Sequence, residues 1–196
     1  LDAGLIKPDA NGHLVQQCGA GLLDVQVDGE GNQRVVSVQA PLPRRSALPP
    51  EIIEALPRAI GNAGAGVGER PVLSDLGARW VLLELASRAQ VRAIVPDLEL
   101  IATLSRSLKV EGLAVFSFEP NLPVPLELRA FAPATGVPED PVTGSAQAAV
   151  GDWLAAQGRL AALGGRYAAS QGHAVGRAGE VHVRHAAGRV HIGRRC

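Results

Sequence analysis

The stretch "EDPVTGSAQAAVGDWLAAQGRL" spans residues 139–160 and joins two acids, a proline and a Thr-Gly-Ser turn to a run of small apolar residues. Within its segment 146–157, only Gln147, Asp152 and Gln157 are strongly polar. A helix that is apolar on nearly every side is buried on nearly every side. Because its small residues would let strands approach closely, the stretch predicts a β-barrel wrapped around a central helix.

The start of this helix has the features of an anion-binding site. Pro141 restricts Asp140 to extended geometry, so the helix must begin after it. The first amide N–H groups of a helix lack intrahelical partners and carry partial positive charge from the helix dipole. Gly144 has no side chain to block an approaching group. The pattern predicts a site for a carboxylate or phosphate at Gly144 and Ser145, with Asp140 as a general acid or base.

Two alternatives use the same residues. In the first, the segment is an ordinary turn in which Thr143 or Ser145 caps the helix, since polar helix starts are common. In the second, Ser145 is the nucleophile of a serine hydrolase. This second alternative fits poorly, because the nucleophile elbow has the pattern Gly-x-Ser-x-Gly and here Thr143 and Gln147 occupy the glycine positions.

The remaining chain predicts strands with a few helices. Two hairpins are predicted, one from "GLLDVQVD" and "QRVVSVQ" and one from "EVHVRH" and "GRVHIG", because apolar and polar residues alternate in each segment. A buried strand is predicted for "RWVLLEL". In "PLELRAFAP" the alternation places Glu127 and Arg129 on a polar face, where Arg129 could pair with Glu139 or Glu127. Helices are predicted for "LPPEIIEALPRAIG", ended or kinked by Pro57, and for "DLELIATLSRSL", capped by Asp97.

The composition favours a soluble globular protein. Of the 196 residues, 46% are hydrophobic but only 3% are aromatic, so the core must consist mainly of aliphatic residues. Lys+Arg and Asp+Glu balance at 19 each, which gives no electrostatic case for binding nucleic acid or an anionic membrane. No apolar run approaches a membrane span and the N-terminus lacks the features of a signal peptide. We therefore expect a cytoplasmic protein.

Cysteines and histidines give little evidence for chemistry. Cys18 and Cys196 make neither a disulfide framework nor a metal cluster, and we expect Cys18 to be a small buried thiol because no activating base lies nearby. His182, His185 and His191 lie in the terminal hairpin. We expect them to face solvent rather than bind metal, because no fixed ligand spacing appears. No metal site is predicted.

The segment "RAFAPATGVPEDPVTGSA" resembles a signature of the phenazine-biosynthesis PhzF-like isomerase and epimerase family. That family characteristically carries Arg-x-Phe-x-Pro, followed by Glu-Asp-(Pro/Ala)-x-Thr-Gly-Ser-Ala. Other matching segments run in the family's order: "LVQQCGAGLLDVQVDG", "LGARWVLLEL", "PDLELIATLSRSL" and "SQGHAVGRAGEVHV". The resemblance covers nearly all of the chain.

The resemblance implies a fold like that of diaminopimelate epimerase, with two similar domains that each form a β-barrel around a central helix. We therefore expect the remainder of an incomplete first domain in residues 1–65 and the second domain, with its C-terminal hairpin, in 66–196. The glycine-rich stretch "GNAGAGVGERP" would link them. By resemblance, Asp140 is the second domain's active-site carboxylate, and Gly144 and Ser145 line the substrate site in the cleft between domains.

The resemblance also implies an activity. In the best-understood member, a first-domain glutamate shuttles a proton between carbons of a dihydro-hydroxyanthranilate without metal or cofactor. We accordingly expect a cofactor-independent isomerase or epimerase that acts by acid–base proton transfer on a small carboxylate-bearing substrate, and, by family analogy, a homodimer.

The family's glutamate and its Gly-His-Pro motif are not in this sequence, which also contains no methionine and opens on "LDAGLIKPDANG". We therefore expect an N-terminally truncated fragment that is inactive and poorly soluble alone. The alternative is a non-catalytic binding or dimerisation protein that kept the fold and lost the base.

Overall fold

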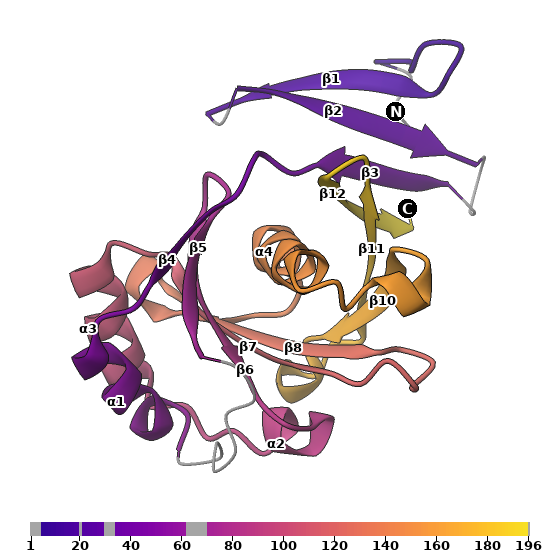
Figure 1. Ribbon diagram of the computed structural model, residues 1–196. Coiled ribbons are helices and arrows are strands. Elements are labelled where there is room, and N and C mark those ends of the chain that lie inside the picture. The colour runs from indigo at the N-terminus through magenta and orange to yellow at the C-terminus, as the bar shows by residue number, and fades with distance from the viewer. Residues whose placement is uncertain (1–4, 20, 30–33, 62–69, 196) are drawn as a thin grey trace.

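One curved sheet surrounding a helix organises the protein (Figure 1). The computed structural model describes residues 5–19, 21–29, 34–61 and 70–195. Within this part of the chain twelve strands form a single sheet, with the order β1-β2-β3-β12-β11-β10-β8-β7-β6-β5-β4 and with β9 paired to β8. The strands are β1 (His13–Cys18), β2 (Gly21–Asp28), β3 (Val35–Gln39), β4 (Arg44–Ala47), β5 (Val72–Asp75), β6 (Arg79–Glu84), β7 (Gly112–Phe118), β8 (Leu126–Ala132), β9 (Val137–Asp140), β10 (Arg166–Gln171), β11 (Gly179–Ala186) and β12 (Arg189–Arg195).

The helices lie on both sides of this sheet. The α-helices are α1 (Pro50–Ala59), α2 (Arg88–Arg92), α3 (Leu98–Leu108) and α4 (Gly144–Ala156), and the short 3₁₀ turns are η2 (Pro133–Thr135), η3 (Ala161–Leu163) and η4 (His173–Val175). Figure 1 shows α4 inside the curve of the sheet and α1, α2 and α3 outside it. None of the described helices has both the length and the apolar character that crossing a membrane requires.

Each parallel pair of strands is joined by a helical crossover, and one of these crossovers runs inside the sheet. Among the described strands, only β6 with β7 and β8 with β10 pair in parallel. Parallel neighbours need a crossover connection, usually a helix. The crossover from β6 to β7 passes through α2 and α3 on the outer face, whereas that from β8 to β10 passes through α4 on the inner face. The predicted α+β fold with mostly antiparallel strands is therefore confirmed.

The predicted barrel does not close. The order of paired strands ends at β1 on one side and at β4 on the other, so the sheet is open. The reason lies in the link from β3 to β4, residues 40–43, which contains Pro41 and Pro43 and therefore offers few N–H groups for pairing. Ala40 N donates to Val190 O (2.8 Å) and extends the β3–β12 pairing, after which the chain passes to β4 beside β5. The sheet wraps around α4, but its hydrogen bonds do not form a ring.

Helix α4 is buried by the inner face of the sheet, as its composition predicts. Ala146, Ala149, Val150 and Leu154 are fully buried in one cluster with inward-facing residues of the strands. The small residues matter for this packing, because a Cβ added at Gly151 would lie 2.9 Å from Val183 Cγ1. The central helix of the prediction is therefore confirmed.

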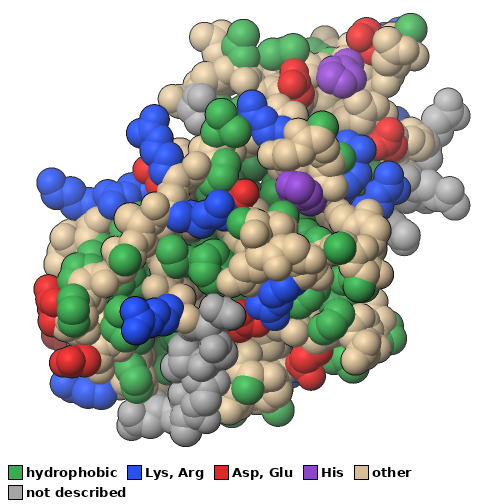
Figure 2. All heavy atoms as spheres, in the orientation of Figure 1, with side chains coloured by type: hydrophobic (Ala, Val, Ile, Leu, Met, Phe, Trp, Pro, Cys, Tyr) green, Lys and Arg blue, Asp and Glu red, His purple; other side chains and the backbone are tan. Residues whose placement is uncertain are grey.

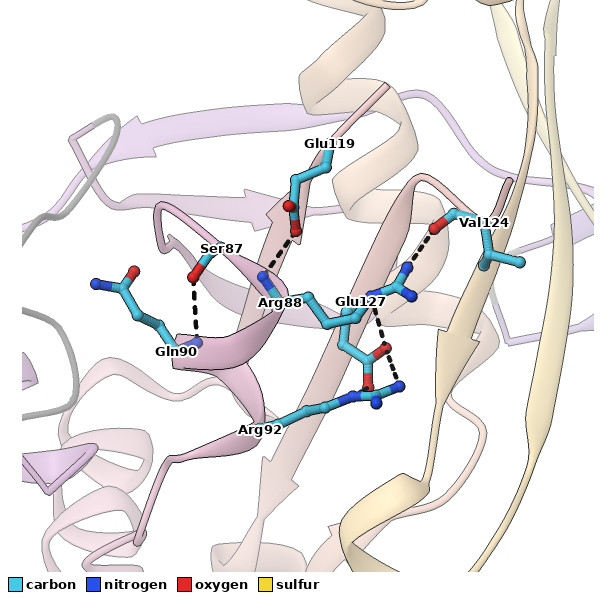
Figure 3. A network of polar contacts seen from close by, with 7 residues as sticks. All are labelled: Ser87, Arg88, Gln90, Arg92, Glu119, Val124 and Glu127. Carbon is cyan, nitrogen blue, oxygen red and sulfur yellow. Dashed lines mark hydrogen bonds and ion pairs between the residues drawn. The ribbon is translucent and has the colours of Figure 1, made fainter. Parts of the chain in front are cut away.

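The outer face forms a second core, which the alternation in β8 does not predict. Glu127 and Arg129 are 1% and 6% exposed, because α2 and α3 cover this face. Glu127 accepts hydrogen bonds from Arg92 Nε (3.1 Å) and Nη2 (3.0 Å) and lies 3.4 Å from Arg88 Nε. Figure 3 shows both arginines reaching Glu127 from α2. Their ion pairs compensate for burying this charge.

Two local predictions are wrong. Helix α1 does not end at Pro57 but continues to Ala59, and its Ile52, Leu56 and Ala59 pack into the outer core. Cys18 is exposed rather than buried, because it ends β1 beside the turn to β2. The junction predicted between residues 65 and 66, and most of the glycine-rich stretch around it, lie outside the described residues.

Candidate functional site

The first turn of α4 has the open geometry that its sequence predicts. The helix begins at Gly144, and its ladder starts with Gln147 N donating to Thr143 O (3.0 Å), so the N–H groups of residues 144–146 precede the ladder. The nearest atom to a Cβ built on Gly144 is Ile192 Cγ2 at 3.9 Å. Thr143 occupies the N-cap position, but its side chain makes no capping hydrogen bond. The ordinary side-chain cap is therefore absent here.

A cavity of about 310 Å³ adjoins this turn. It lies between α4, the turn from β5 to β6, and the link from β3 to β4, where the sheet is open. Gly144 and Ser145 form part of its wall, and the rest is largely apolar, with contributions from Leu76, Pro41 and Ile192 among others. The structure thus brings both predicted substrate-binding residues to one cavity.

Ser145 is tied to the sheet by a tryptophan. The indole Nε1–H of Trp80, at the start of β6, donates to Ser145 Oγ at 3.0 Å. Trp80 is 3% exposed, and its backbone is paired on both sides, to β5 and to β7. Within the described residues no histidine or carboxylate hydrogen-bonds to Ser145, so the arrangement lacks the base that a serine nucleophile needs.

A buried glutamine holds the turn that precedes the helix. Gln171, at the end of β10, is 1% exposed. Its Nε2 donates to Asp140 O (2.7 Å) and Thr143 Oγ1 (2.8 Å), and its Oε1 accepts from Thr143 N (3.1 Å) and Gln147 Nε2 (3.1 Å). One side chain therefore links β9, the N-cap and the first turn of α4.

Two glycines let the backbone of this turn pack closely against its neighbours. A Cβ at Gly172, which has φ +88°, would lie 2.7 Å from Pro141 O, and a Cβ at Gly179 would lie 2.9 Å from the same oxygen. Only glycine fits both positions without displacing the turn. The segment "SQGHAVGRAGEVHV" thus contains the packing partners of "EDPVTGSA".

Asp140 ends β9 and is half-buried. Its Oδ1 accepts from Val142 N at 3.0 Å, which fixes the carboxylate within the turn. The preceding Glu139 pairs with Arg129 at 2.8 Å, and Arg129 also donates to Ile94 O (2.8 Å), two residues beyond α2. The predicted pairing of Arg129 with Glu139 is confirmed. Asp140 is not among the residues that line the cavity with Gly144 and Ser145; it lies four residues before Gly144, in the turn that leads into α4.

Two other places, the histidines of the terminal hairpin and the end of α4 opposite Ser145, give weaker evidence of a functional site than the first turn of α4. Among the described residues no three His, Cys, Asp or Glu side chains are grouped to hold a metal ion. A larger hollow of about 660 Å³ adjoins β4 and α1, and its Arg45 is paired with Asp152 at 2.6 Å. On the face of the molecule that Figure 2 shows, in the orientation of Figure 1, hydrophobic side chains gather near the middle and Lys and Arg side chains lie around them. None of the predicted site residues lies in this hollow.

Sequence reasoning missed Trp80 and Gln171. Neither residue carries a local pattern that indicates a site, because each acts on the turn from a strand distant in sequence: 65 residues separate Trp80 from Ser145, and 28 separate Gln171 from Thr143. The one signal for either residue is its place in a segment that resembles the family, "LGARWVLLEL" for Trp80 and "SQGHAVGRAGEVHV" for Gln171.

The sheet wrapped around a buried helix, whose first turn opens on a cavity, defines a sheet-dominated α+β protein. Its fold is similar to that of a solved structure described as a Bacillus anthracis phenazine biosynthesis protein of the PhzF family, with a TM-score of 0.74 and 18% identity; the match covers 98% of this chain and 67% of that chain. It is also similar to the structure of a predicted epimerase of Pseudomonas aeruginosa, with a TM-score of 0.74 and 19% identity; that match covers 99% of this chain and 66% of that chain. The family described as "Phenazine biosynthesis-like protein" matches residues 3–194. The chain belongs to this family.

Two curated relatives of this chain are named as isomerases. An uncharacterized isomerase of Deinococcus radiodurans is 43% identical over 116 residues, which cover 58% of this chain and 37% of that protein. An uncharacterized isomerase of Clostridium acetobutylicum is 30% identical over 177 residues, covering 87% of this chain and 58% of that protein. The chain therefore spans less than two thirds of the length of these relatives.

Proposed function

We propose that the protein is an isomerase or epimerase that moves a proton on a small carboxylate-bearing substrate. The observation that carries this proposal is the arrangement at α4: an open first turn at Gly144 and Ser145, a fixed carboxylate at Asp140 just before it, and a largely apolar cavity against it. The family membership and the relatives named isomerases support the reaction class.

Each residue has a distinct role in this proposal. The substrate carboxylate docks at Gly144 and Ser145, where free N–H groups and the helix dipole favour an anion. Asp140 transfers or orients the proton. The chemistry needs no metal or cofactor. Moving a proton between two positions also needs a second acid–base group, which we assign to the part of the relatives that this chain does not match. We therefore expect the 196-residue chain alone to show no turnover.

Hydrogen–deuterium exchange tests the reaction. The protein, in the longest form that its reading frame encodes, is incubated in D₂O with a panel of small unsaturated carboxylic acids and amino acids, and uptake of deuterium at carbon is followed by ¹H NMR. We expect Asp140→Asn to slow exchange by about 100-fold or more, which is the usual contribution of a general acid–base group. The matched control is Glu99→Gln, an exposed carboxylate on α3.

Exchange that is equally fast in Asp140→Asn and in the control would show that this carboxylate does not act in the reaction. Carboxylates that bind at Gly144 and Ser145 without any exchange would instead favour a non-catalytic binding protein of the same fold. Labelling of Ser145 by a fluorophosphonate probe would favour a hydrolase, and we expect none.

A further inference from the structure

We propose that Trp80 is a positioning residue that turns the Ser145 hydroxyl into a hydrogen-bond donor for the bound carboxylate. This inference rests on the proposed function, because it assumes that an anion binds at the first turn of α4. It assigns to this site a residue that neither the helix motif nor the cavity wall contains.

The indole of Trp80 and the hydroxyl of Ser145 differ in what they can donate and accept. An indole N–H is a donor only, whereas a serine hydroxyl has one hydrogen to donate and two lone pairs that accept. Trp80 Nε1 lies 3.0 Å from Ser145 Oγ, so the hydroxyl must accept in this contact and must direct its own hydrogen elsewhere. A serine at this position without Trp80 could rotate freely between donating and accepting.

The surroundings leave the cavity as the place for that hydrogen. Within the described part of the chain, the bond from Trp80 is the one hydrogen bond that the Ser145 hydroxyl makes. Ser145 lines the cavity beside Gly144. An anion accepts hydrogen bonds and cannot donate them, so a hydroxyl fixed as a donor matches a carboxylate and disfavours a ligand that offers only donors there.

The tryptophan is held firmly enough to impose this polarity. Its ring is packed in the inner core with Leu82 and Ala146, and its backbone pairs with Ser74 on one side and Gly112 on the other. A side chain with two torsions, locked by packing, loses little further freedom when it makes the bond. The donor direction at Ser145 is therefore preset before a ligand arrives.

Two-dimensional ¹H–¹⁵N NMR of the labelled protein tests the contact directly. The indole signals are assigned with Trp80→Phe and with Trp153→Phe, the other tryptophan of this chain, which lies on α4 away from Ser145. We expect Ser145→Ala to move the indole proton of Trp80 upfield, because its acceptor is lost, and to leave that of Trp153 in place. An unmoved Trp80 signal would overturn the proposal. Because the chain has two tryptophans, Trp153→Phe alone assigns both indole signals by elimination, so the measurement does not depend on whether Trp80→Phe folds.

Binding of sodium benzoate, with benzamide as the uncharged counterpart, tests the positioning role. We expect Ser145→Ala to weaken benzoate binding by about tenfold and Trp80→Phe by about fivefold, with Trp153→Phe unchanged. In the Ser145→Ala background, Trp80→Phe should add no further loss, because its effect acts through Ser145.

The outcomes separate the two proposals. If the wild-type protein binds benzoate no better than benzamide, the anion site of the proposed function fails and the positioning role fails with it. If benzoate binds preferentially but Trp80→Phe binds as tightly as wild type, or weakens binding equally in the Ser145→Ala background, only the positioning role is overturned.

Discussion

Gln171→Leu tests whether one buried side chain holds the turn before α4. Leucine has a similar volume but forms none of the four hydrogen bonds that Gln171 makes to Asp140, Thr143 and Gln147. Thr143 is 6% exposed and Gln147 is fully buried, so their freed polar groups cannot reach bulk water. A buried polar group left unpaired costs about 1–3 kcal/mol. Thr143 N–H and Gln147 Nε2 are the two buried donors that lose their acceptor, and at about 2 kcal/mol each the variant should lose about 4 kcal/mol of unfolding free energy.

That loss corresponds to a fall in melting temperature of about 8–16 °C for a chain of this size. Thermal unfolding followed by circular dichroism measures it. Gln16→Leu, the same substitution on the exposed strand β1, is the control and should change stability by no more than about 0.5 kcal/mol. If Gln171→Leu melts within about 2 °C of the control, the hydrogen bonds of Gln171 do not hold the turn, and the reasoning fails.

Three further predictions concern the core and pH. Gly151→Ala should destabilise by about 1–3 kcal/mol despite a better helix propensity, because the added Cβ would lie 2.9 Å from a core valine; urea unfolding measures this loss, and a more stable variant would contradict it. Arg129→Met should cost about 3–5 kcal/mol in the same assay, since it leaves Glu139 buried without its partner, and adding Glu139→Gln should restore much of the loss. Burial and the nearby Arg184 guanidinium lower the pKa of His191 below its usual 6.5. The folded state therefore binds fewer protons than the unfolded chain just below pH 6.5, so protonation of His191 lowers the free energy of unfolding as pH falls. Between pH 7.5 and 5.5, His191→Gln should lose less unfolding free energy than the wild type, and equal losses would refute this.

Patterns of residues close in sequence predicted the elements of this protein well. The two hairpins formed by β2 with β3 and by β11 with β12 follow from alternating apolar and polar residues. Asp97 caps α3 as expected, with Oδ1 accepting from Leu100 N at 2.9 Å. These features depend on side chains within a few positions of one another, so a local reading captures them.

Residues that the fold covers from a distance were predicted poorly. The alternation in β8 predicts one apolar and one polar face, yet Glu127 and Arg129 are both buried. The polar residues tolerate burial because α2 supplies Arg88 and Arg92 to one, and β9 supplies Glu139 to the other. No periodicity within β8 indicates those partners.

Closure of the sheet was also a question that the local pattern could not answer. An apolar helix requires strands around it, but whether those strands form a ring depends on how β3 and β4 meet at residues 40–43. That opening is where the cavity beside Gly144 and Ser145 lies, so the departure from a closed barrel and the candidate site occur together.

The sequence by itself determined that α4 is buried and that its first turn is open, because composition and the order of Pro141, Thr143 and Gly144 act within one segment. Only the tertiary structure decided what surrounds that turn. Trp80 reaches Ser145 from β6, and Gln171 reaches Asp140 and Thr143 from β10. Hydrogen bonds between distant segments depend on strand register and packing, and these are properties of the folded sheet as a whole.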